Sequence, residues 1–350
     1  MFPAQALAEE MLARGWRVRL ATDARGARYA SGFPPEVERR ATAAATFAQG
    51  NALTRVTAPF AIAAGTAAMW QDMRRDRPAC VAGFGGYPAL PAMLAARQLE
   101  VPILIHEQNG VLGRVNRYFA PKVNVVACGI WPTPVPTGTR AVHTGNPVRA
   151  AVLDRHGDTY LEPGDHPMGL VVIGGSQGAG LFGRLVPEAL RLLAPELRAR
   201  LRLSQQVRAE DMDRVRATYE EMGLAAELRS FFDDVPERLA EASLVVSRAG
   251  ASSIADITVI GRPAILIPYP HATDDHQAAN AAGLVSAGGA FMIREAELTA
   301  EGLAGHITAI LSDPEGARAM AEASRSQGRP DATEHLAALV EDLAGKGAKA

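Results

Sequence analysis

Two glycine- and serine-rich turns in the second half of the chain have the composition of phosphate-binding loops. Residues 174–180 (GGSQGAG) follow the apolar run 170–173 and precede a helical pattern. Residues 247–253 (SRAGASS) follow the apolar run 244–246 and open a second helix. Backbone N–H groups at a helix N-terminus, together with the helix dipole, bind anions. Two such turns predict a nucleotide diphosphate site, whereas the alternative for each is a tight connection that needs small residues.

One hydroxyl and one carboxylate near these turns could contact such a ligand directly. The Ser176 hydroxyl would point along the backbone amides of its turn. Asp256 lies one turn into the second helix and could accept hydrogen bonds from ribose hydroxyls, or it could simply complement the helix dipole. Residues 174–180 lack the Lys-Ser/Thr of a P-loop and the GxGxxG order, and no acidic residue ends the next strand. These absences disfavour a P-loop NTPase and a dehydrogenase.

Polar and glycine-rich segments also follow two apolar runs in the first half. Residues 83–88 (GFGGYP) contain glycines that allow a ligand to approach the backbone closely. Residues 106–110 (HEQNG) place polar side chains after the run 103–105, where burying them without a function is costly. His106 and Glu107 point to opposite sides of a continuing strand, so at most one would face a substrate directly. The alternative is a solvated loop with a capped histidine.

Three further segments carry ambiguous signals. Arg149 ends residues 145–149 (GNPVR) and suits a diphosphate or a base edge, with a surface ion pair as the alternative. Residues 271–277 (HATDDHQ) lack a consistent third metal ligand despite two His and two Asp. Asp211 and Asp213 have the DxD spacing of metal-dependent glycosyl transfer, yet their charged helix start favours a solvated face. No motif therefore requires a metal ion or a cofactor.

Composition and charge exclude several classes of protein. The 350 residues are 48% hydrophobic and 21% charged, which is typical of a globular protein with two domains. A net charge of −2 lacks the excess of positive charge that is typical of proteins that bind nucleic acid. Cys80 and Cys128 form neither a disulfide framework nor a CxxC pair, which fits buried thiols in a reducing cytosol.

The longest apolar stretch has two interpretations. Residues 58–70 are too few to span a bilayer. They are followed by Arg74, Arg75 and Arg77, which give the predicted helix a basic edge. This helix is either a core helix or a patch that contacts a membrane surface.

Apolar runs of strand length alternate with helical spacing along the whole chain. Continuous apolar runs favour parallel strands buried on both faces, and their alternation with helices predicts doubly wound α/β domains. The runs are residues 18–21, 80–84, 103–105, 123–128, 170–173, 244–246 and 264–267. A stretch rich in Pro, Thr and Gly over residues 131–168 precedes a fresh strand, so we place a hinge at residues 146–149.

We therefore expect two Rossmann-like domains, of residues 1–148 and 149–330. Residues 331–350 form a last helical pattern after a Gly-Arg-Pro break, and we expect this helix to cross back to the first domain. The first domain opens with a helical pattern, where a doubly wound domain normally has a strand and a glycine turn. Either this domain is built differently or about a dozen residues precede Met1.

Together these motifs resemble the MurG-type UDP-N-acetylglucosamine transferases of peptidoglycan synthesis, over essentially the whole chain. The segments that carry the resemblance are residues 2–4, 85–87, 106–110, 145–149, 174–179, 247–256, 270–277 with Asn280, and 330–333. The resemblance implies a GT-B fold, with two Rossmann-like domains facing a cleft. It implies inverting transfer of GlcNAc from UDP-GlcNAc to the 4-hydroxyl of undecaprenyl-pyrophosphoryl-muramyl-pentapeptide, which converts lipid I to lipid II.

The resemblance also implies a cellular setting. Such an enzyme would be cytoplasmic and peripheral on the cytoplasmic face of the inner membrane. It would serve cell wall biogenesis, and through it cell shape and cell division, with other cell-wall synthesis proteins as possible partners.

Roles for individual residues follow from the same resemblance. The residues implied to bind UDP-GlcNAc are Asn109, Arg149, Ser176, Gln177, Phe231, Phe232, Gly250, Ala251, Ser252, Asp256, His276 and Gln277. Among them the two phenylalanines would hold uracil, Asp256 the ribose, and Gln277 with His276 the GlcNAc hydroxyls. The residues implied on the acceptor side are Gly85, Gly86, Tyr87, His106, Glu107 and Asn116. His106 and Glu107 are the candidates for the catalytic base.

The sequence departs from the family pattern at three places. The family has a strand and a Gly-Gly-Thr-Gly-Gly-His loop before the position of Phe2. Asp256 stands where a longer Glu is usual, and residues 205–208 (QQVR) replace a His-Gln and a Gly. Two alternatives therefore stay open, namely a catalytically weak UDP-GlcNAc-binding protein and a related nucleotide-sugar transferase with another acceptor.

Overall fold

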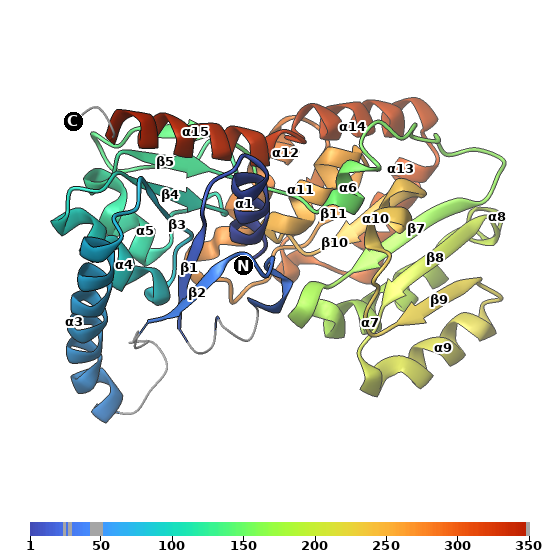
Figure 1. The fold of residues 1–350 in the computed structure, drawn as a ribbon. Coiled ribbons are helices and arrows are strands. Elements are labelled where there is room, and N and C mark those ends of the chain that lie inside the picture. The colour runs from blue at the N-terminus through green and yellow to red at the C-terminus, as the bar shows by residue number, and fades with distance from the viewer. Residues whose placement is uncertain (24–25, 27–29, 43–51, 348–350) are drawn as a thin grey trace. The chain divides into compact units, whose positions relative to one another are not determined.

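The computed structural model describes residues 1–23, 26, 30–42 and 52–347, without the side chains of residues 31, 52–58, 175–179 and 346–347 (Figure 1). The chain folds into two compact units. Unit 1 comprises Met1–Val148 together with Asp331–Ala350, and unit 2 comprises Arg149–Pro330. In the described residues no helix is long and apolar enough to cross a membrane.

Unit 2 is built on one parallel sheet with the strand order β12-β11-β10-β7-β8-β9. Its strands are β7 (Met168–Ile173), β8 (Leu201–Gln206), β9 (Ala226–Arg229), β10 (Ala242–Ser247), β11 (Ala264–Leu266) and β12 (Ala290–Met292). Its helices are α6 (Ala150–Leu153), α7 (Gly175–Arg191), α8 (Pro195–Ala199), α9 (Met212–Glu221), α10 (Val235–Ala240), α11 (Ala251–Ile260), α12 (His276–Ser286), α13 (Ala300–Leu311) and α14 (Pro314–Ser326).

The core of unit 2 lies on the two faces of its central strands. β10 is buried at all six positions, as expected of a parallel strand covered on both sides. α7, α9 and α13 contribute to the apolar cluster on one face, where the side chains of Leu170, Phe182 and Ile307 meet. α11 packs against α6, α10, α12 and α14 on the other face.

Unit 1 contains two parallel sheets, with the strand orders β1-β2 and β3-β4-β5-β6. Its strands are β1 (Arg19–Thr22), β2 (Glu38–Ala41), β3 (Val81–Gly83), β4 (Ile103–Glu107), β5 (Val125–Cys128) and β6 (Ala141–His143). Its longer helices are α1 (Phe2–Ala13), α3 (Ala52–Arg75), α4 (Leu90–Gln98), α5 (Arg114–Phe119) and α15 (Ala332–Gly347).

Two helical layers cover the four-stranded sheet of unit 1. α3 and α4 pack with Ile103 and Ile105 on one face. α1 and α15 pack with Leu104 and Val125 on the other face, where Leu336 of α15 is fully buried. The C-terminal helix is therefore an integral layer of this unit.

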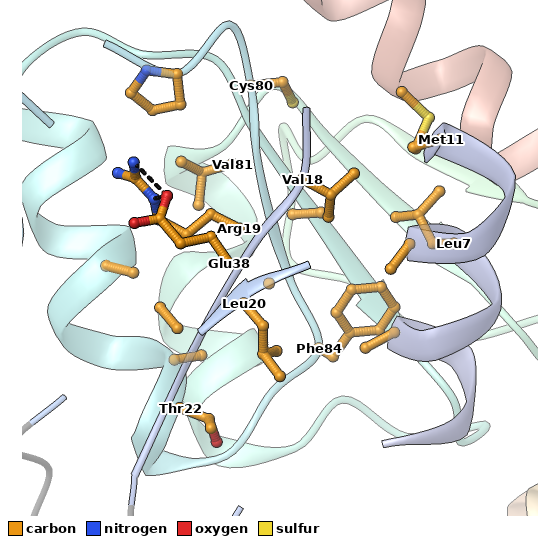
Figure 2. A pocket seen from close by; sticks show the side chains of 18 of the residues that line it. Leu7, Met11, Val18, Arg19, Leu20, Thr22, Glu38, Cys80, Val81 and Phe84 are labelled. Carbon is orange, nitrogen blue, oxygen red and sulfur yellow. Dashed lines mark hydrogen bonds and ion pairs between the residues drawn. The ribbon is translucent and has the colours of Figure 1, made fainter. Parts of the chain in front are cut away.

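A cavity of about 700 Å³ lies in unit 1 between β1 and β3 (Figure 2). All residues of both strands line it. Neither strand pairs with the other, although each pairs with its outer neighbour, β2 or β4. In the described residues, no strand lies in space between β1 and β3, which belong to separate sheets.

The structure confirms the predicted fold class. Parallel sheets with helices on their faces occur in both units, and strands lie within or overlap every predicted apolar run. The shorter or more polar strands β2, β6, β8, β9 and β12 were not predicted.

The packing of α15 predicts a measurable contribution to the stability of unit 1. Leu336→Ala removes a fully buried side chain and should lower the free energy of unfolding by about 2–5 kcal/mol. The three tryptophans, Trp16, Trp70 and Trp131, all lie in unit 1, so urea unfolding followed by tryptophan fluorescence reports this unit. Glu334→Ala, at an exposed position of the same helix, should change the free energy of unfolding by less than about 0.5 kcal/mol. Equal effects of the two changes would contradict the packing.

Candidate functional site

Two helix N-termini lie next to each other at one edge of the unit 2 sheet. β7 and β10 are neighbouring parallel strands in the register Ile173 to Ser247, so their carboxyl ends meet. The backbone N–H of Arg248 donates to the carbonyl of Ile173 at 3.3 Å, which holds the two strand ends together. α7 begins after Gly174 and α11 begins after Gly250. The backbone N–H groups at both helix starts therefore lie at the same edge of the sheet. An anion bound there would be stabilised by both helix N-termini.

The predicted diphosphate-binding residues occupy these two helix starts. Gly250 is the extended N-cap of α11, Ala251 is its first residue and Ser252 is exposed. Ser176 and Gln177 fall in the first turn of α7, and their side chains lie outside the described part of the structure.

A buried glutamine connects the first of these turns to another loop. The Gln206 carbonyl oxygen accepts from the backbone N–H of Gly174 at 3.2 Å. The same amide group donates to the carbonyl of Ser230 at 3.0 Å. Gln206 thereby fixes the glycine turn and the segment before Phe231 relative to each other. In the sequence Gln206 stands out only as a departure from the family pattern. Its role was not visible there, because the residues to which it is hydrogen-bonded lie 32 and 24 positions away.

A buried arginine fixes the second turn. The Arg248 guanidinium donates to the carbonyls of Ile267 and Pro268 at 3.3 and 3.2 Å. It also pairs with Glu295 at 2.6 Å. Its charge is thus compensated inside the protein, as burial of a cation requires. Arg248 anchors the strand end that leads into α11, and sequence analysis had given it no role of its own.

Arg149 and Asp256 form an ion pair beside the start of α11. The guanidinium lies 3.7 Å from the carboxylate, and the Asp256 side chain is only 15% exposed. Burial raises the pKa of the Asp256 carboxyl to about 6, and the charge of Arg149 opposes this rise. The structure therefore brings together a partly exposed cation and a buried acceptor, one helical turn from the N-terminus of α11.

The other predicted donor-binding residues differ in accessibility. Phe231 is 72% exposed, whereas Phe232 is buried with the Arg238 guanidinium 4.2 Å from its ring centre. A base could stack on Phe231 as placed, but not on Phe232. The His276 Nδ1 lies 2.8 Å from the carbonyl of Thr273 at the start of α12.

Gln277 is held by the strand end before it. The backbone N–H of Tyr269 donates to the Gln277 carbonyl oxygen at 2.9 Å. This hydrogen bond orients the Gln277 side chain.

In unit 1 the carboxylate of Glu107 organises the loop that follows β4. One of its oxygens accepts from the backbone and side-chain amides of Asn109 at 3.1 and 3.3 Å. The other accepts from the Gly113 backbone at 2.9 Å and from the Asn116 amide at 2.8 Å. Glu107 is 4% exposed, so these four donors replace its water shell. The carboxylate fixes the positions of Asn109 and Asn116.

His106 is completely buried on the opposite side of the strand. Burial lowers the pKa of its imidazole to about 4, which makes the ring neutral at pH 7. Its Nε2 lies 3.3 Å from the Gly145 carbonyl, and its ring packs against Phe84 at 5.6 Å. Among the described residues its Nδ1 has no hydrogen-bond partner. The prediction that His106 or Glu107 takes the acceptor proton stays a prediction.

The glycine turn after β3 lies beside the same loop. Gly85 and Gly86 have φ of +78° and +75°, which other residues rarely adopt. A Cβ atom on Gly85 would lie 3.1 Å from the Asn116 amide nitrogen. Gly85 therefore allows close contact with Asn116, and Tyr87, two residues on, opens a short 3₁₀ turn.

Within the described ranges, no group of three or more His, Cys, Asp or Glu side chains could hold a metal ion. Asp211, of the DxD spacing, pairs with Arg214 at 2.6 Å. Asp275, of the 271–277 segment, pairs with Arg294 at 3.0 Å.

Comparisons with known proteins agree in both halves of the chain. Residues 1–128 match the glycosyltransferase family 28 N-terminal domain, and residues 169–336 match the C-terminal domain of this family. The UDP-N-acetylglucosamine–N-acetylmuramyl-(pentapeptide) pyrophosphoryl-undecaprenol N-acetylglucosamine transferase of a Chelativorans species is 47% identical. The enzyme of the same name from Rhizobium etli is 45% identical. Each comparison covers 98% of this chain and 92% of the relative.

Solved structures show the same relationship. The crystal structure of MurG from Acinetobacter baumannii superposes with a TM-score of 0.80 at 29% identity, covering 97% of this chain and 95% of that one. A calicheamicin glycosyltransferase superposes with a TM-score of 0.63 at 15% identity, covering 99% and 95%, which shows the fold alone. With both domain models matched and such relatives along nearly its whole length, the chain belongs to glycosyltransferase family 28, and within it to the MurG-type N-acetylglucosamine transferases.

Proposed function

We propose that this chain transfers GlcNAc from UDP-GlcNAc to the 4-hydroxyl of lipid-linked N-acetylmuramyl-pentapeptide, with inversion at the anomeric carbon. The observation that carries the proposal is the pair of helix N-termini at the ends of β7 and β10, with Asp256 buried beside them. A nucleotide diphosphate and its ribose fit this combination. The names of the relatives supply the sugar and the acceptor.

The chemistry of the donor follows from where charge develops. Loss of UDP leaves negative charge on the diphosphate and positive charge on the anomeric carbon. The amides that open α7 and α11 are fixed before the reaction, so they stabilise the leaving diphosphate without reorganisation. Gln206 and Arg248 hold the two turns in place. Asp256 would accept hydrogen bonds from the ribose, and Arg149 would lie beside the nucleotide.

Unit 1 would position the acceptor and the reacting end of the donor. The acceptor hydroxyl must pass its proton to a base within hydrogen-bond reach. As placed, Glu107 is saturated by four donors and His106 is neutral and buried. We assign Glu107 to positioning Asn109 and Asn116, which would reach the sugar and the acceptor.

A lipid acceptor requires access to a membrane surface. Phe60 of α3 is 74% exposed, and Arg74 and Arg75 form a basic end of this helix. These residues favour α3 as the contact with an anionic bilayer. The enzyme would then lie peripherally at the cytoplasmic face of the inner membrane, in peptidoglycan synthesis, and so support cell shape and division.

The direct test measures UDP release from UDP-GlcNAc with a soluble lipid I analogue. Turnover that depends on the analogue and yields a disaccharide product supports the proposal. Binding of UDP-GlcNAc without turnover would favour a binding protein instead. Turnover with a different acceptor only would favour a related transferase.

Asp256→Asn should weaken UDP binding by about 1–3 kcal/mol, because the amide replaces a charged acceptor of ribose hydroxyls. The same change should raise the free energy of unfolding at pH 7 by about 1–3 kcal/mol, because an ionised carboxylate with a raised pKa is unfavourable in the folded state. Calorimetric titration and urea unfolding measure the two effects. Asp165→Asn, at a fully exposed position, should change neither.

The pH dependence of binding provides a second readout at Asp256. Its carboxylate is ionised above a pKa of about 6, so affinity for UDP-GlcNAc, whose diphosphate is esterified at both ends and does not titrate near this pH, should fall as the pH drops through 6. In Asp256→Asn this dependence should disappear. A pH profile shared by both proteins would remove Asp256 from the nucleotide site.

Glu107→Gln should lower kcat by about 10²-fold or more, because two of four donors would face an amide nitrogen and the loop would shift. The KM for UDP-GlcNAc should change little, since the diphosphate and ribose contacts lie in unit 2. Glu100→Gln makes the same chemical change at an exposed carboxylate of unit 1 and should keep full activity. A rise in KM with an unchanged kcat would contradict the positioning role.

A further inference from the structure

The segment that follows β8 leaves the sheet of unit 2 beside the start of α7. β8 pairs with β7 in parallel, in the register Val172 to Gln205, so the two strands end at the same edge. β7 leads into α7, and Arg208 follows the last residue of β8 by two positions. Arg208 has extended backbone dihedral angles and precedes the short 3₁₀ turn Ala209–Asp211. An arginine therefore lies at the edge where the proposed diphosphate site begins.

Two glycines of α7 allow this segment to pack directly on the helix. A Cβ atom on Gly180 would lie 3.0 Å from the guanidinium carbon of Arg208, and 3.1 and 3.2 Å from two of its nitrogens. A Cβ atom on Gly183, three residues further along α7, would lie 3.5 Å from the Asp211 carboxylate. Glycine inside a helix is destabilising relative to alanine, so alanine is preferred unless space is limited. At Gly180 the Arg208 guanidinium occupies the space that a side chain would fill.

The guanidinium lies one helical turn from the residue that the family resemblance implies to face the diphosphate. Gly180 follows Ser176 by four residues, and residues four apart lie on the same face of a helix. Each residue adds about 1.5 Å along the axis, so this turn separates the two residues by about 6 Å. The Arg208 side chain can cover that distance by rotation about its own bonds. Arg208 is therefore within reach of an anion bound at the first amides of α7.

The charge and accessibility of Arg208 suit a phosphate at this place. A guanidinium offers N–H donors in a planar fork and can bind two phosphate oxygens at once. The Arg208 side chain is 49% exposed and lies 3.7 Å from Glu210, whose side chain is 69% exposed. An ion pair of this length at the surface contributes little, so a phosphate can replace the glutamate. Arg248, at the neighbouring helix start, is instead buried and held by Glu295 at 2.6 Å.

We propose that Arg208 binds the diphosphate of UDP-GlcNAc at the start of α7, and that Gly180 leaves the space its side chain needs. This inference rests on the proposed function and adds a residue to its donor site. The backbone amides of α7 give the phosphate oxygens directed donors, and Arg208 adds a full positive charge. Because loss of UDP leaves negative charge on the diphosphate, the same contact stabilises the leaving group.

The family resemblance gives Arg208 no role. It belongs to residues 205–208, where the sequence departs from the family pattern. The residues implied to hold uracil and ribose, Phe231 and Asp256, lie on other elements of unit 2. A loss of the Arg208 contact should therefore affect the phosphates and not the nucleoside.

Ligands that differ in their phosphates test the charge of Arg208. Calorimetric titration measures the affinity of the full chain for UDP-GlcNAc and UDP, and ligand-observed NMR measures that for uridine. Arg208→Gln should weaken UDP-GlcNAc and UDP by about tenfold or more and leave uridine unchanged, because a charged hydrogen bond to phosphate is lost. Arg208→Lys should lose less, since it keeps the charge but not the planar fork. Arg216→Gln removes the same charge at an exposed position of α9 and should change none of the three affinities.

The two glycines of α7 separate the phosphate contact from the stability of the helix. Gly180→Ala and Gly183→Ala both introduce a better helix former, so each should raise the unfolding midpoint, followed by circular dichroism, by about 2–4 °C. Only the methyl group at 180 meets the guanidinium, whereas the one at 183 makes ordinary contacts. Gly180→Ala should therefore weaken UDP about threefold or more, and Gly183→Ala should not. In the Arg208→Gln background, Gly180→Ala should have no further effect on affinity.

The other outcomes overturn the inference, and they are distinguishable from a failure of the proposed function. Unchanged affinity of Arg208→Gln for UDP would remove Arg208 from the site and leave the proposed function standing. Equal weakening of UDP and uridine would assign Arg208 to the fold of the site and not to the phosphates. Unchanged affinity of Gly180→Ala would contradict the role of Gly180. If the unaltered chain does not bind UDP-GlcNAc at all, the proposed function itself fails.

Discussion

The parallel pairing of β7 with β10 is the constraint on which the donor site depends. Because the strands run in the same direction and in register, both loops that leave them start at the same edge, and both helices that follow direct their N-termini there. The remaining features serve this arrangement. Gln206 ties the first turn to the segment before Phe231, and Arg248 ties the second turn to the end of β11. Asp256 stays buried at a cost in stability, which is typical of groups kept for binding.

Unit 1 uses a buried carboxylate for the same purpose. Glu107 at the end of β4 gathers backbone and side-chain donors from the following ten residues, and so turns a loop into a fixed surface. The neutral His106 on the other side of the strand avoids a second buried charge. The four-stranded sheet that carries these residues has β3 at one edge, and β3 also lines the cavity of unit 1.

The sequence predicted the interior of the fold better than its margins. The apolar runs that became β4, β5, β7 and β10 were recognised because both faces of such strands are buried. β2 and β9 were not predicted because they are edge strands with polar residues. β8 was not predicted because buried and more exposed residues alternate along its first half. The glycine turns were visible as local patterns. Gln206 and Arg248 were not, since their roles arise from contacts across the sheet that no local pattern encodes.

The central claim is that the paired helix N-termini of unit 2 bind the diphosphate of UDP-GlcNAc. A crystal structure of the chain with UDP tests this most directly. The account predicts phosphate oxygens within hydrogen-bond distance of the first amides of α7 and α11, with the ribose hydroxyls on Asp256. A diphosphate bound away from both helix starts, or a ribose that does not contact Asp256, would contradict it.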